Sequence, residues 1–223
     1  MSLPARVPFA MPLRRFVLGI SGASGAVYAL RLLHLLLDDG HEVHLVVSDY
    51  GRRLLFDEAR IKNLTLAELA PALAKGKAAA RVAKRLIIHP NKDVGAVIAS
   101  GSFPHEGMAV LPCSSASLGA IATGSGSNLL CRAAAVCLKE RRRLIICHRE
   151  MPLSLIDIRN METLSLAGAT ICSPNPGFYL HPKGVDDLVD FVVGKVLDHL
   201  GVEHELATRW KSESPAEAGG HDD

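Results

Sequence analysis

The chain has 223 residues, enough to bury one sizeable hydrophobic core and little more than one domain. Hydrophobic residues make up 48% and charged residues 22%, as in an ordinary globular protein, and no run of about 18 uncharged apolar residues marks a membrane-spanning helix. A formal net charge of only +2 makes nucleic acid and anionic membrane surfaces poor candidates for partners.

The first predicted elements form a strand-helix-strand unit. Residues 1–13 contain three prolines and no periodicity, which predicts a flexible N-terminal arm. The stretch RFVLGI, Arg15–Ile20, is a short apolar strand. A charged start gives it some likeness to a signal peptide, but the run is rich in glycine and continues into a helical pattern. That helix begins at Ala26 and ends at Gly40, and EVHLVVS, Glu42–Ser48, is a second strand, so the unit predicts a parallel sheet.

The stretch from Asp49 to Pro90 has a weaker pattern. It begins as a helix and becomes rich in alanine and lysine in ALAKGKAAARVAKR. A basic DNA-binding helix is one interpretation, but no aromatic residues interleave with the charges and the net charge of the chain is low. We therefore expect a solvated helix face or a loop.

Strand signals return four times further along the chain, in GAVIAS (Gly95–Ser100), MAVLP (Met108–Pro112), RLIICH (Arg143–His148) and ATICS (Ala169–Ser173). Helical patterns lie between several of them, and a final helix from Val185 to Leu200 has one apolar face. The alternation predicts a doubly wound, Rossmann-like three-layer α/β domain with a mostly parallel sheet over residues 14–210. Residues 211–223 have the composition of a disordered tail.

Ligands of such sheets bind beyond the carboxyl ends of the strands, so the loops that follow the strands form the candidate site. The first loop, SGASG, combines glycines with the hydroxyls of Ser21 and Ser24, and it precedes a helix whose free N–H groups favour phosphate. Ser48 and Asp49 are expected close to it. Asp49 has the spacing of a ribose-binding acid, but glycines spaced G-x-x-G-x-x-G make NAD the weaker interpretation.

The loop after MAVLP is dense in hydroxyls and glycine. Ser114, Ser115 and Ser117 can bind a phosphate or the polar edge of a ring, and a helix that starts at Asn128 carries Arg132 one turn in. A helix N-cap followed by a flexible turn explains the same residues without a ligand.

Charged residues flank the strand RLIICH. Lys139 precedes it, and Arg149 and Glu150 follow it. An arginine there can grip phosphate with two hydrogen bonds and a neighbouring glutamate can move a proton, but a structural ion pair is equally compatible. In PNPGFY, Phe178 and Tyr179 either line a pocket or pack as a plain turn.

The five cysteines and ten histidines show no ligand spacing. No two cysteines form a C-x-x-C pair and their number is odd, so we expect neither a disulfide framework nor a zinc site, but buried thiols in a reducing cytosol. The histidines form no H-E-x-x-H pattern, and we expect no metal.

Six stretches occur in a characteristic order: GISGASGAVYALRLL, ASGSF, PCSSASLGAIATGSGSNLLCRAA, LKERRRLIICHREMPLS, NMETLSLAGATI and PGFYLHP. From about Arg15 to Trp210 the chain thereby resembles the UbiX-type flavin prenyltransferases. The resemblance implies a flavodoxin-like subunit that binds reduced FMN, needs no metal and assembles as a cytoplasmic homododecamer. It further implies transfer of a dimethylallyl group from dimethylallyl monophosphate to N5 and C6 of the flavin. The product, prenylated FMN, serves UbiD-type decarboxylases of ubiquinone or aromatic-acid metabolism.

The resemblance also assigns roles to residues of this chain. FMN contacts fall on Gly22, Ala23, Ser24, Ser48, Ser114, Ser115, Ser117 and Arg132. Contacts with the prenyl phosphate fall on Ser100, Gly101, Lys139, Arg149, Glu150, Tyr179 and Lys195, and Glu58 and Trp210 align with the region of the active site. Ser24 and Glu150 are implied to handle protons, while the cations Lys139, Arg149 and Lys195 stabilise the departing phosphate.

The chain departs from the usual family pattern at three positions. Ser117 stands where threonine is frequent, Val97 lies near a common proline, and Asp157 replaces a frequent histidine. None of these departures removes a proposed catalytic group.

Two other functions remain open. One is an FMN-dependent cysteine decarboxylase acting on phosphopantothenoylcysteine or a peptidyl cysteine, and the other is a non-catalytic FMN-binding subunit. No clear catalytic histidine adjoins a flavin loop, and the stretch REMPLS favours the prenyltransferase. Turnover without a partner protein would exclude the non-catalytic subunit.

Overall fold

The computed structural model describes residues 13–206 of the 223. Trp210, the predicted tail and all but the last residue of the predicted N-terminal arm lie outside the described residues. Six strands are present in the described part: β1 Arg15–Ile20, β2 Glu42–Val47, β3 Leu86–Pro90, β4 Gly107–Cys113, β5 Arg143–His148 and β6 Thr170–Ile171. They form one sheet in the order β3-β2-β1-β4-β5-β6, and every neighbouring pair is parallel. This doubly wound order confirms the predicted α/β fold.

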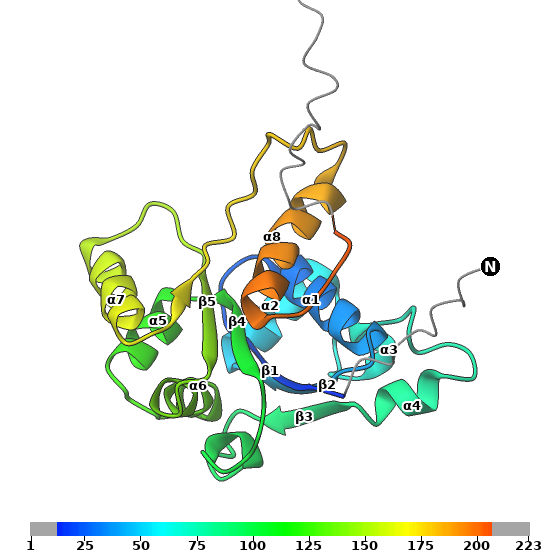
Figure 1. Cartoon of the computed structure of the whole chain (residues 1–223), viewed down its shortest axis with the longest axis horizontal. Coiled ribbons are helices and arrows are strands. Elements are labelled where there is room, and N and C mark those ends of the chain that lie inside the picture. The colour runs from blue at the N-terminus through cyan, green and yellow to red at the C-terminus, as the bar shows by residue number, and fades with distance from the viewer. Residues whose placement is uncertain (1–12, 207–223) are drawn as a thin grey trace, which may run out of the picture.

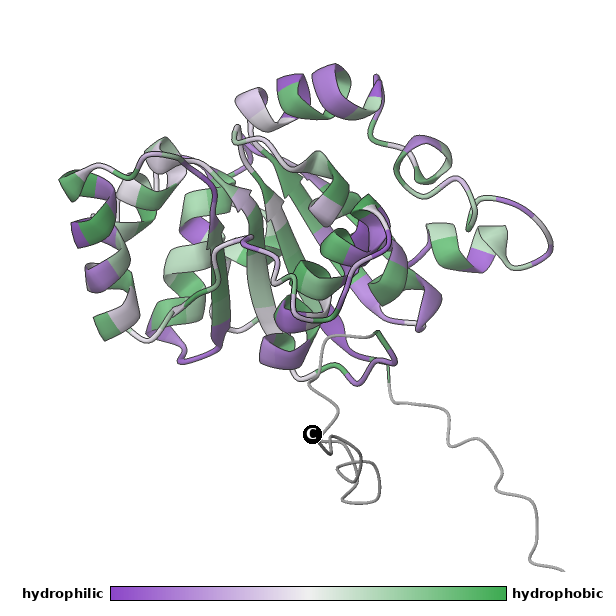
Figure 2. Ribbon diagram, turned by 90° about the horizontal axis from the view of Figure 1, so that it is seen from above, coloured by the Kyte–Doolittle hydropathy of each residue, from purple (hydrophilic) through white to green (hydrophobic). Residues whose placement is uncertain are grey.

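Helices cover both faces of the sheet (Figure 1). They are α1 Ala26–Asp38, α2 Asp49–Ala59, α3 Leu66–Leu69, α4 Ala79–Ala83, α5 Ser115–Ala122, α6 Leu129–Lys139, α7 Leu155–Leu166, α8 Val185–Leu200 and the 3-10 turn η1 Val97–Ala99. Side chains alternate along each strand and so supply two cores. In β1, Phe16 and Leu18 join the core of α1 and α8, whereas Val17 joins the core of α5 and α6. Figure 2 shows the mostly apolar strands enclosed by helices that carry hydrophilic residues.

Several predicted elements have the expected bounds. β1, β5 and α8 begin and end at the predicted residues, and β4 and β6 differ from prediction by a few residues at their ends. Gly40, with φ 92°, follows the end of α1 as expected of a residue that leaves a helix in the left-handed region. Within residues 13–206, no helix has the length and apolarity that crossing a membrane requires.

The prediction of a strand at Gly95–Ser100 is wrong. This stretch contains only the short turn η1, and of its residues only Ile98 is buried, where it joins the core beside α6. The missing strand is β3, which pairs with β2 and lies in the stretch that was expected to be a helix face or loop. β3 is an edge strand with half-buried side chains, so it lacks the strong apolar pattern of the central strands.

This correction changes where the loop ASGSF lies. Since no strand precedes it, Ser100 and Gly101 do not follow the carboxyl end of a strand. The loop leads into β4, so it lies at the amino edge of the parallel sheet, the edge opposite the other candidate loops.

Candidate functional site

The loops after β1, β2 and β4 converge at the carboxyl edge of the sheet. The amide of Ser48 donates to the carbonyl of Ile20 at 2.9 Å, and the amide of Ser21 donates to the carbonyl of Pro112 at 3.1 Å. The hydroxyl of Ser21 accepts from the amide of Ser114 at 2.8 Å. The predicted proximity of Ser48 to the first loop is thus confirmed. The loops meet between β1 and β4, where the strand order reverses and doubly wound proteins bind ligands.

The first loop lies tightly against the start of α2. A Cβ atom on Gly22 would clash with Cβ of Tyr50, so only glycine fits there. Gly25 has φ 124°, a conformation that other residues rarely adopt, and it caps α1. The structure therefore explains why glycine occupies these two positions, which the spacing of the motif alone did not.

The N-terminus of α1 is capped by a carboxylate. Glu58, in the last turn of α2, accepts hydrogen bonds from the amides of Gly25 at 3.0 Å and Ala26 at 2.8 Å, and also from Ser24. Partial burial alone would raise the pKa of Glu58, but hydrogen bonds from Ser24, Ala26 and Gly25 and the charge of Arg149 outweigh it and lower the pKa. The expectation that these amides are free for phosphate is wrong, because Glu58 already binds them.

Arg149 and Glu150 follow the end of β5 at the same edge of the sheet. The space between the loops that follow β1, β4 and β5, where doubly wound sheets bind ligands, is called the crevice below. The amide of Arg149 donates to the carbonyl of Cys113 at 3.1 Å, and both side chains are exposed. The charge of Arg149 acts on Glu58 across the crevice. A carboxylate oxygen of Glu150 accepts from the amide of Met151 at 3.0 Å, which limits where this carboxylate can turn.

The serines after β4 fall into two groups. Ser114 is the N-cap of α5 and accepts from the amide of Ser117 at 3.3 Å, while the hydroxyls of the two residues lie 3.3 Å apart. Ser115 turns toward His148, and its Oγ lies 3.0 Å from Nε2 of that histidine. Arg132 is exposed in the first turn of α6. The N-cap interpretation of Ser114 is therefore confirmed, and its hydroxyl still lies beside Ser21 at the crevice.

Two residues beside the site were not singled out as functional from the sequence. His148, at the end of β5, and Asp157, in the first turn of α7, have side chains that are 1% and 8% exposed and lie 3.7 Å apart. The replacement of a frequent histidine by Asp157 was the only sequence signal for this pair. In the structure, both residues of the pair contact Ser115, one of the predicted site residues.

Ser100, Gly101 and Lys139 gather at the other edge of the sheet. A Cβ on Gly101 would lie 3.2 Å from Nζ of Lys139, which ends α6. The guanidinium of Arg142 donates to the carbonyl of Gly101 at 2.5 Å. The six-residue strand β1 alone separates the two edges by about 20 Å. One copy of the chain therefore does not bring these three residues to the first loop.

Tyr179 and Lys195 lie near the β6 edge. The ring of Tyr179 packs edge-on against Phe191 of α8, with centroids 5.7 Å apart. Nζ of Lys195 lies 3.9 Å from the carboxylate of Asp198. A hydrogen bond from Cys147 and the charge of Lys195 together lower the pKa of Cys172, despite burial. Lys195 thus lies close to the end of β6, although it belongs to α8.

All five cysteines are free thiols, and four are buried. Burial raises the pKa of Cys137 to about 12, so this thiol is unreactive at neutral pH. In residues 13–206, no group of three or more His, Cys, Asp or Glu side chains has the arrangement of a metal site.

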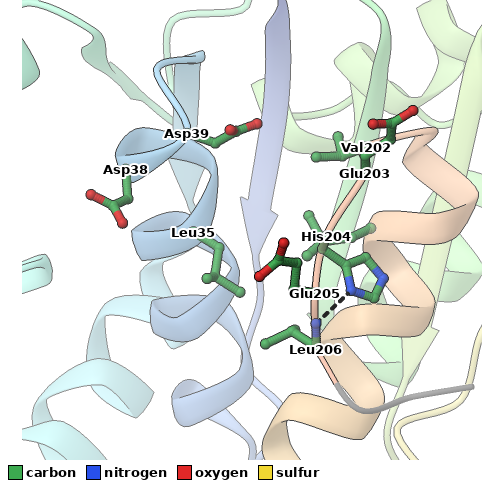
Figure 3. A pocket seen from close by; sticks show the side chains of 9 residues that line it. Leu35, Asp38, Asp39, Val202, Glu203, His204, Glu205 and Leu206 are labelled. Atoms are coloured by element: carbon green, nitrogen blue, oxygen red, sulfur yellow. Dashed lines mark hydrogen bonds between the residues drawn. The ribbon is translucent and has the colours of Figure 1, made fainter. Parts of the chain in front are cut away.

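A separate surface groove lies between the C-terminal end of α1 and residues 202–206 (Figure 3). Asp38 and Asp39 line it from one side, and Glu203 and Glu205 from the other. His204 accepts there from the amide of Leu206 at 3.2 Å. The C-terminal end of α1 is remote from the loops that follow β1 and β4, so this acidic groove is not part of the crevice.

The crevice has the chemistry of a site for a phosphorylated ring. It offers the hydroxyls of Ser24 and Ser114, the guanidinium of Arg149, the carboxylate of Glu58 and a glycine that lets the first loop pack closely. This fits FMN, which has an anionic phosphate and a polar aromatic ring system.

The fold and this loop arrangement define a flavin-type α/β protein, and a family model described as Flavoprotein matches residues 6–197. The flavin prenyltransferase UbiX of Halalkalibacterium halodurans is 45% identical over 89% of this chain and 94% of its own length. That of Thermoplasma acidophilum is 43% identical over 88% of this chain and 99% of its own length. The chain belongs to the Flavoprotein family and, within it, to the UbiX-type flavin prenyltransferases.

Solved structures agree with this family assignment. AnUbiX, in complex with FMN and dimethylallyl pyrophosphate, superimposes with a TM-score of 0.76 at 36% identity, covering 86% of this chain and 94% of its own. A dodecameric FMN-dependent UbiX-like decarboxylase from Escherichia coli O157:H7 also gives 0.76, at 38% identity, covering 88% and 99%. The cysteine decarboxylase TvaF gives 0.56 at 13% identity over 84% of this chain and 98% of its own, a likeness of fold alone.

Proposed function

We propose that this protein joins a dimethylallyl group from dimethylallyl monophosphate to N5 and C6 of reduced FMN, making prenylated FMN. One observation carries the proposal. Ser24 and Glu58 from the first loop and α2 meet the charge of Arg149 from β5 at the strand-order reversal. A hydroxyl, a carboxylate and a cation then flank the place where a ligand binds in a doubly wound sheet.

The chain's own residues suit the binding of FMN. Gly22, Ala23 and Ser24 in the first loop, Ser48 at the start of α2, segment 114–117 and Arg132 would hold it. Their hydroxyls and amides are neutral donors, and Arg132 adds a positive charge near the start of α6. When bound, reduced FMN supplies the electron-rich N5 and C6 atoms that accept the allyl group.

Phosphate departure from the allylic carbon leaves negative charge on the leaving group. Arg149 stabilises that charge where it develops, and Lys139 and Lys195 add to this stabilisation where they reach the site. Ring closure at C6 of bound FMN would release a proton. Glu150, exposed beside Arg149, would accept this proton, with Ser24 and its hydrogen-bonded Glu58 as the relay.

We further propose that the site is completed by other copies of the chain in a homododecamer. Ser100, Gly101 and Lys139 lie at the amino edge of their own sheet, so they reach a flavin only in a neighbouring copy. Helix α7 and the loop before it expose Met151, Ile156 and Leu166 by 87%, 72% and 84%, a surface suited to burial between subunits. The E. coli relative described as dodecameric supports this assembly.

Four finer assignments belong to the same proposal. Residues 14–210 act as one flavoprotein domain, and Tyr179 and Trp210 contribute to the substrate site. The free cysteines support a reducing location such as the cytoplasm. A UbiD-type decarboxylase receives the product.

The test is an anaerobic incubation with reduced FMN and dimethylallyl monophosphate, followed by mass spectrometry of the flavin. A second arm supplies the pyrophosphate donor, which decides the preferred leaving group. Prenylated FMN formed without any partner protein supports the proposal and excludes a non-catalytic subunit. Folded protein that binds FMN and forms no prenylated flavin from either donor overturns it.

A further inference from the structure

Two buried polar side chains, His148 and Asp157, meet the partly buried Ser115 next to the Arg149–Glu150 pair. Ser115 is the first residue of α5, His148 the last of β5 and Asp157 lies in the first turn of α7. His148 Nε2 lies 3.0 Å from Ser115 Oγ and 3.7 Å from Asp157 Oδ1. The three groups thus connect α5 to the two ends of the segment that joins β5 to α7.

The direction of each hydrogen bond follows from counting protons. The carboxylate of Asp157 only accepts, so its hydrogen bond with Ser115 uses the single hydroxyl proton of that serine. His148 must then donate to Ser115 through Nε2–H. Burial lowers the pKa of His148 more than the carboxylates of Asp157 and Glu150 raise it, which favours the neutral ring.

Asp157 also holds the far end of the loop that follows His148. It accepts from the amide of Ser154 at 3.1 Å and from its hydroxyl at 2.6 Å, and Ser154 in turn caps α7. The residues between these two ends, 149–153, are all exposed and have no buried side chain of their own to hold them. One end of the loop is therefore linked to Asp157 through His148 and Ser115, and the other end is held by Asp157 directly through Ser154.

We propose that Ser115, His148 and Asp157 form a positioning network that holds the loop carrying Arg149 and Glu150 in its reactive orientation. Ser115 acts inside this network through its side chain and is not a hydroxyl ligand of the flavin. The inference rests on the proposed function, because it concerns the orientation of the two residues assigned to phosphate and proton.

The kinetic test compares His148→Leu, His148→Gln and Ser115→Ala in the full-length protein, with reduced FMN and dimethylallyl monophosphate. In His148→Leu, kcat falls about ten- to a hundredfold, as for a misplaced catalytic group, while the Kd for FMN changes little. His148→Gln recovers most of kcat because its amide still donates to Ser115. The double variant Ser115→Ala/His148→Leu is no slower than the slower single variant, because the residues act as one unit.

A matched control is His41→Leu, which replaces an equally buried histidine at the amino edge of the sheet. It is expected to alter thermal stability and leave kcat unchanged. Wild-type kcat in His148→Leu, or single-variant losses that multiply in the double variant, overturns the network. A loss of FMN affinity in Ser115→Ala equal to its loss of kcat shows that Ser115 binds the flavin directly and overturns it too.

Two further measurements do not depend on turnover. Nitrogen NMR of the wild-type protein should find His148 protonated at Nε2 and not at Nδ1, and the opposite tautomer overturns the proposal. Hydrogen exchange at residues 149–153 should be faster in His148→Leu than in wild type and slower again in His148→Gln. If the wild type makes no prenylated FMN, the proposed function fails, while these two results still decide whether the network exists.

Discussion

The carboxylate of Glu58 lies over the N-terminus of α1 and accepts from the amide of Ala26 at 2.8 Å. Phosphate-binding loops commonly leave such amides for the ligand. Here a side chain from α2 occupies them and also binds Ser24. The first loop thereby brings the hydroxyl of Ser24 and the carboxylate of Glu58 into direct hydrogen-bond contact.

Glu58→Gln should reduce stability in a pH-dependent way. The pKa of Glu58 in the folded protein lies below the ordinary value of 4.5, so its contribution to stability is present above pH 4.5 and is lost as pH falls through the lowered pKa. Urea unfolding across this range should show a difference between wild type and variant that shrinks in acid.

Glu68→Gln is the matched control, because Glu68 also accepts from backbone amides, at Lys62 and Asn63, and its pKa is also lowered. It should lower stability without affecting FMN binding, whereas Glu58→Gln should affect both. A difference between Glu58→Gln and wild type that grows on acidification would contradict the assignment.

Ser24→Ala and Glu150→Gln should slow product formation and leave FMN binding largely intact. Each change removes a proton-transfer group without removing a positive charge from the phosphate site, and general acid-base catalysis typically contributes about 10²–10⁴-fold. Single-turnover rates and FMN fluorescence titrations measure the two properties separately. An equal loss of affinity and rate would make these residues binding groups only.

Mixing two inactive variants tests the shared site. Lys139→Met and Arg149→Met are each expected to be inactive, but co-assembled subunits should regain about a quarter of wild-type activity if each site takes Lys139 and Arg149 from different copies. Activity is measured after dissociation and reassembly of an equal mixture. If both residues of a site came from one chain, the mixture would stay inactive.

His105 should make the protein acid-sensitive well before its carboxylates protonate. Burial lowers the pKa of His105 to about 4, so between pH 6.5 and 4 the unfolded state binds a proton that the folded state does not. Stability should fall over this range by about 3 kcal/mol from this group.

His105→Gln should reduce this slope without removing it, because burial also lowers the pKa of His41 and His89. Unfolding free energies at several pH values measure the slope, and an NMR titration of His105 measures the pKa directly. A His105 that titrates near 6.5 would rule out this source of acid sensitivity.

Much of the framework was predictable because it depends on local patterns. The bounds of β1 and β5 follow from short apolar runs that end at glycine or charged residues, and α8 follows from its single apolar face. The edge strand β3 was missed because edge strands are buried on fewer sides and need less apolar sequence. GAVIAS was mistaken for a strand because one buried residue, Ile98, accompanies several apolar but more exposed ones.

The sequence by itself determined the α/β class, the family and the types of residue that carry the chemistry, because periodicity and motifs are written in neighbouring residues. Only the tertiary structure decided how those residues combine. It placed Glu58 on the α1 amides, turned Ser115 toward His148 and put Lys139 at the opposite edge of the sheet. Each of these outcomes depends on contacts between segments distant in the chain, and the direction of a strand or helix decides which edge a residue reaches.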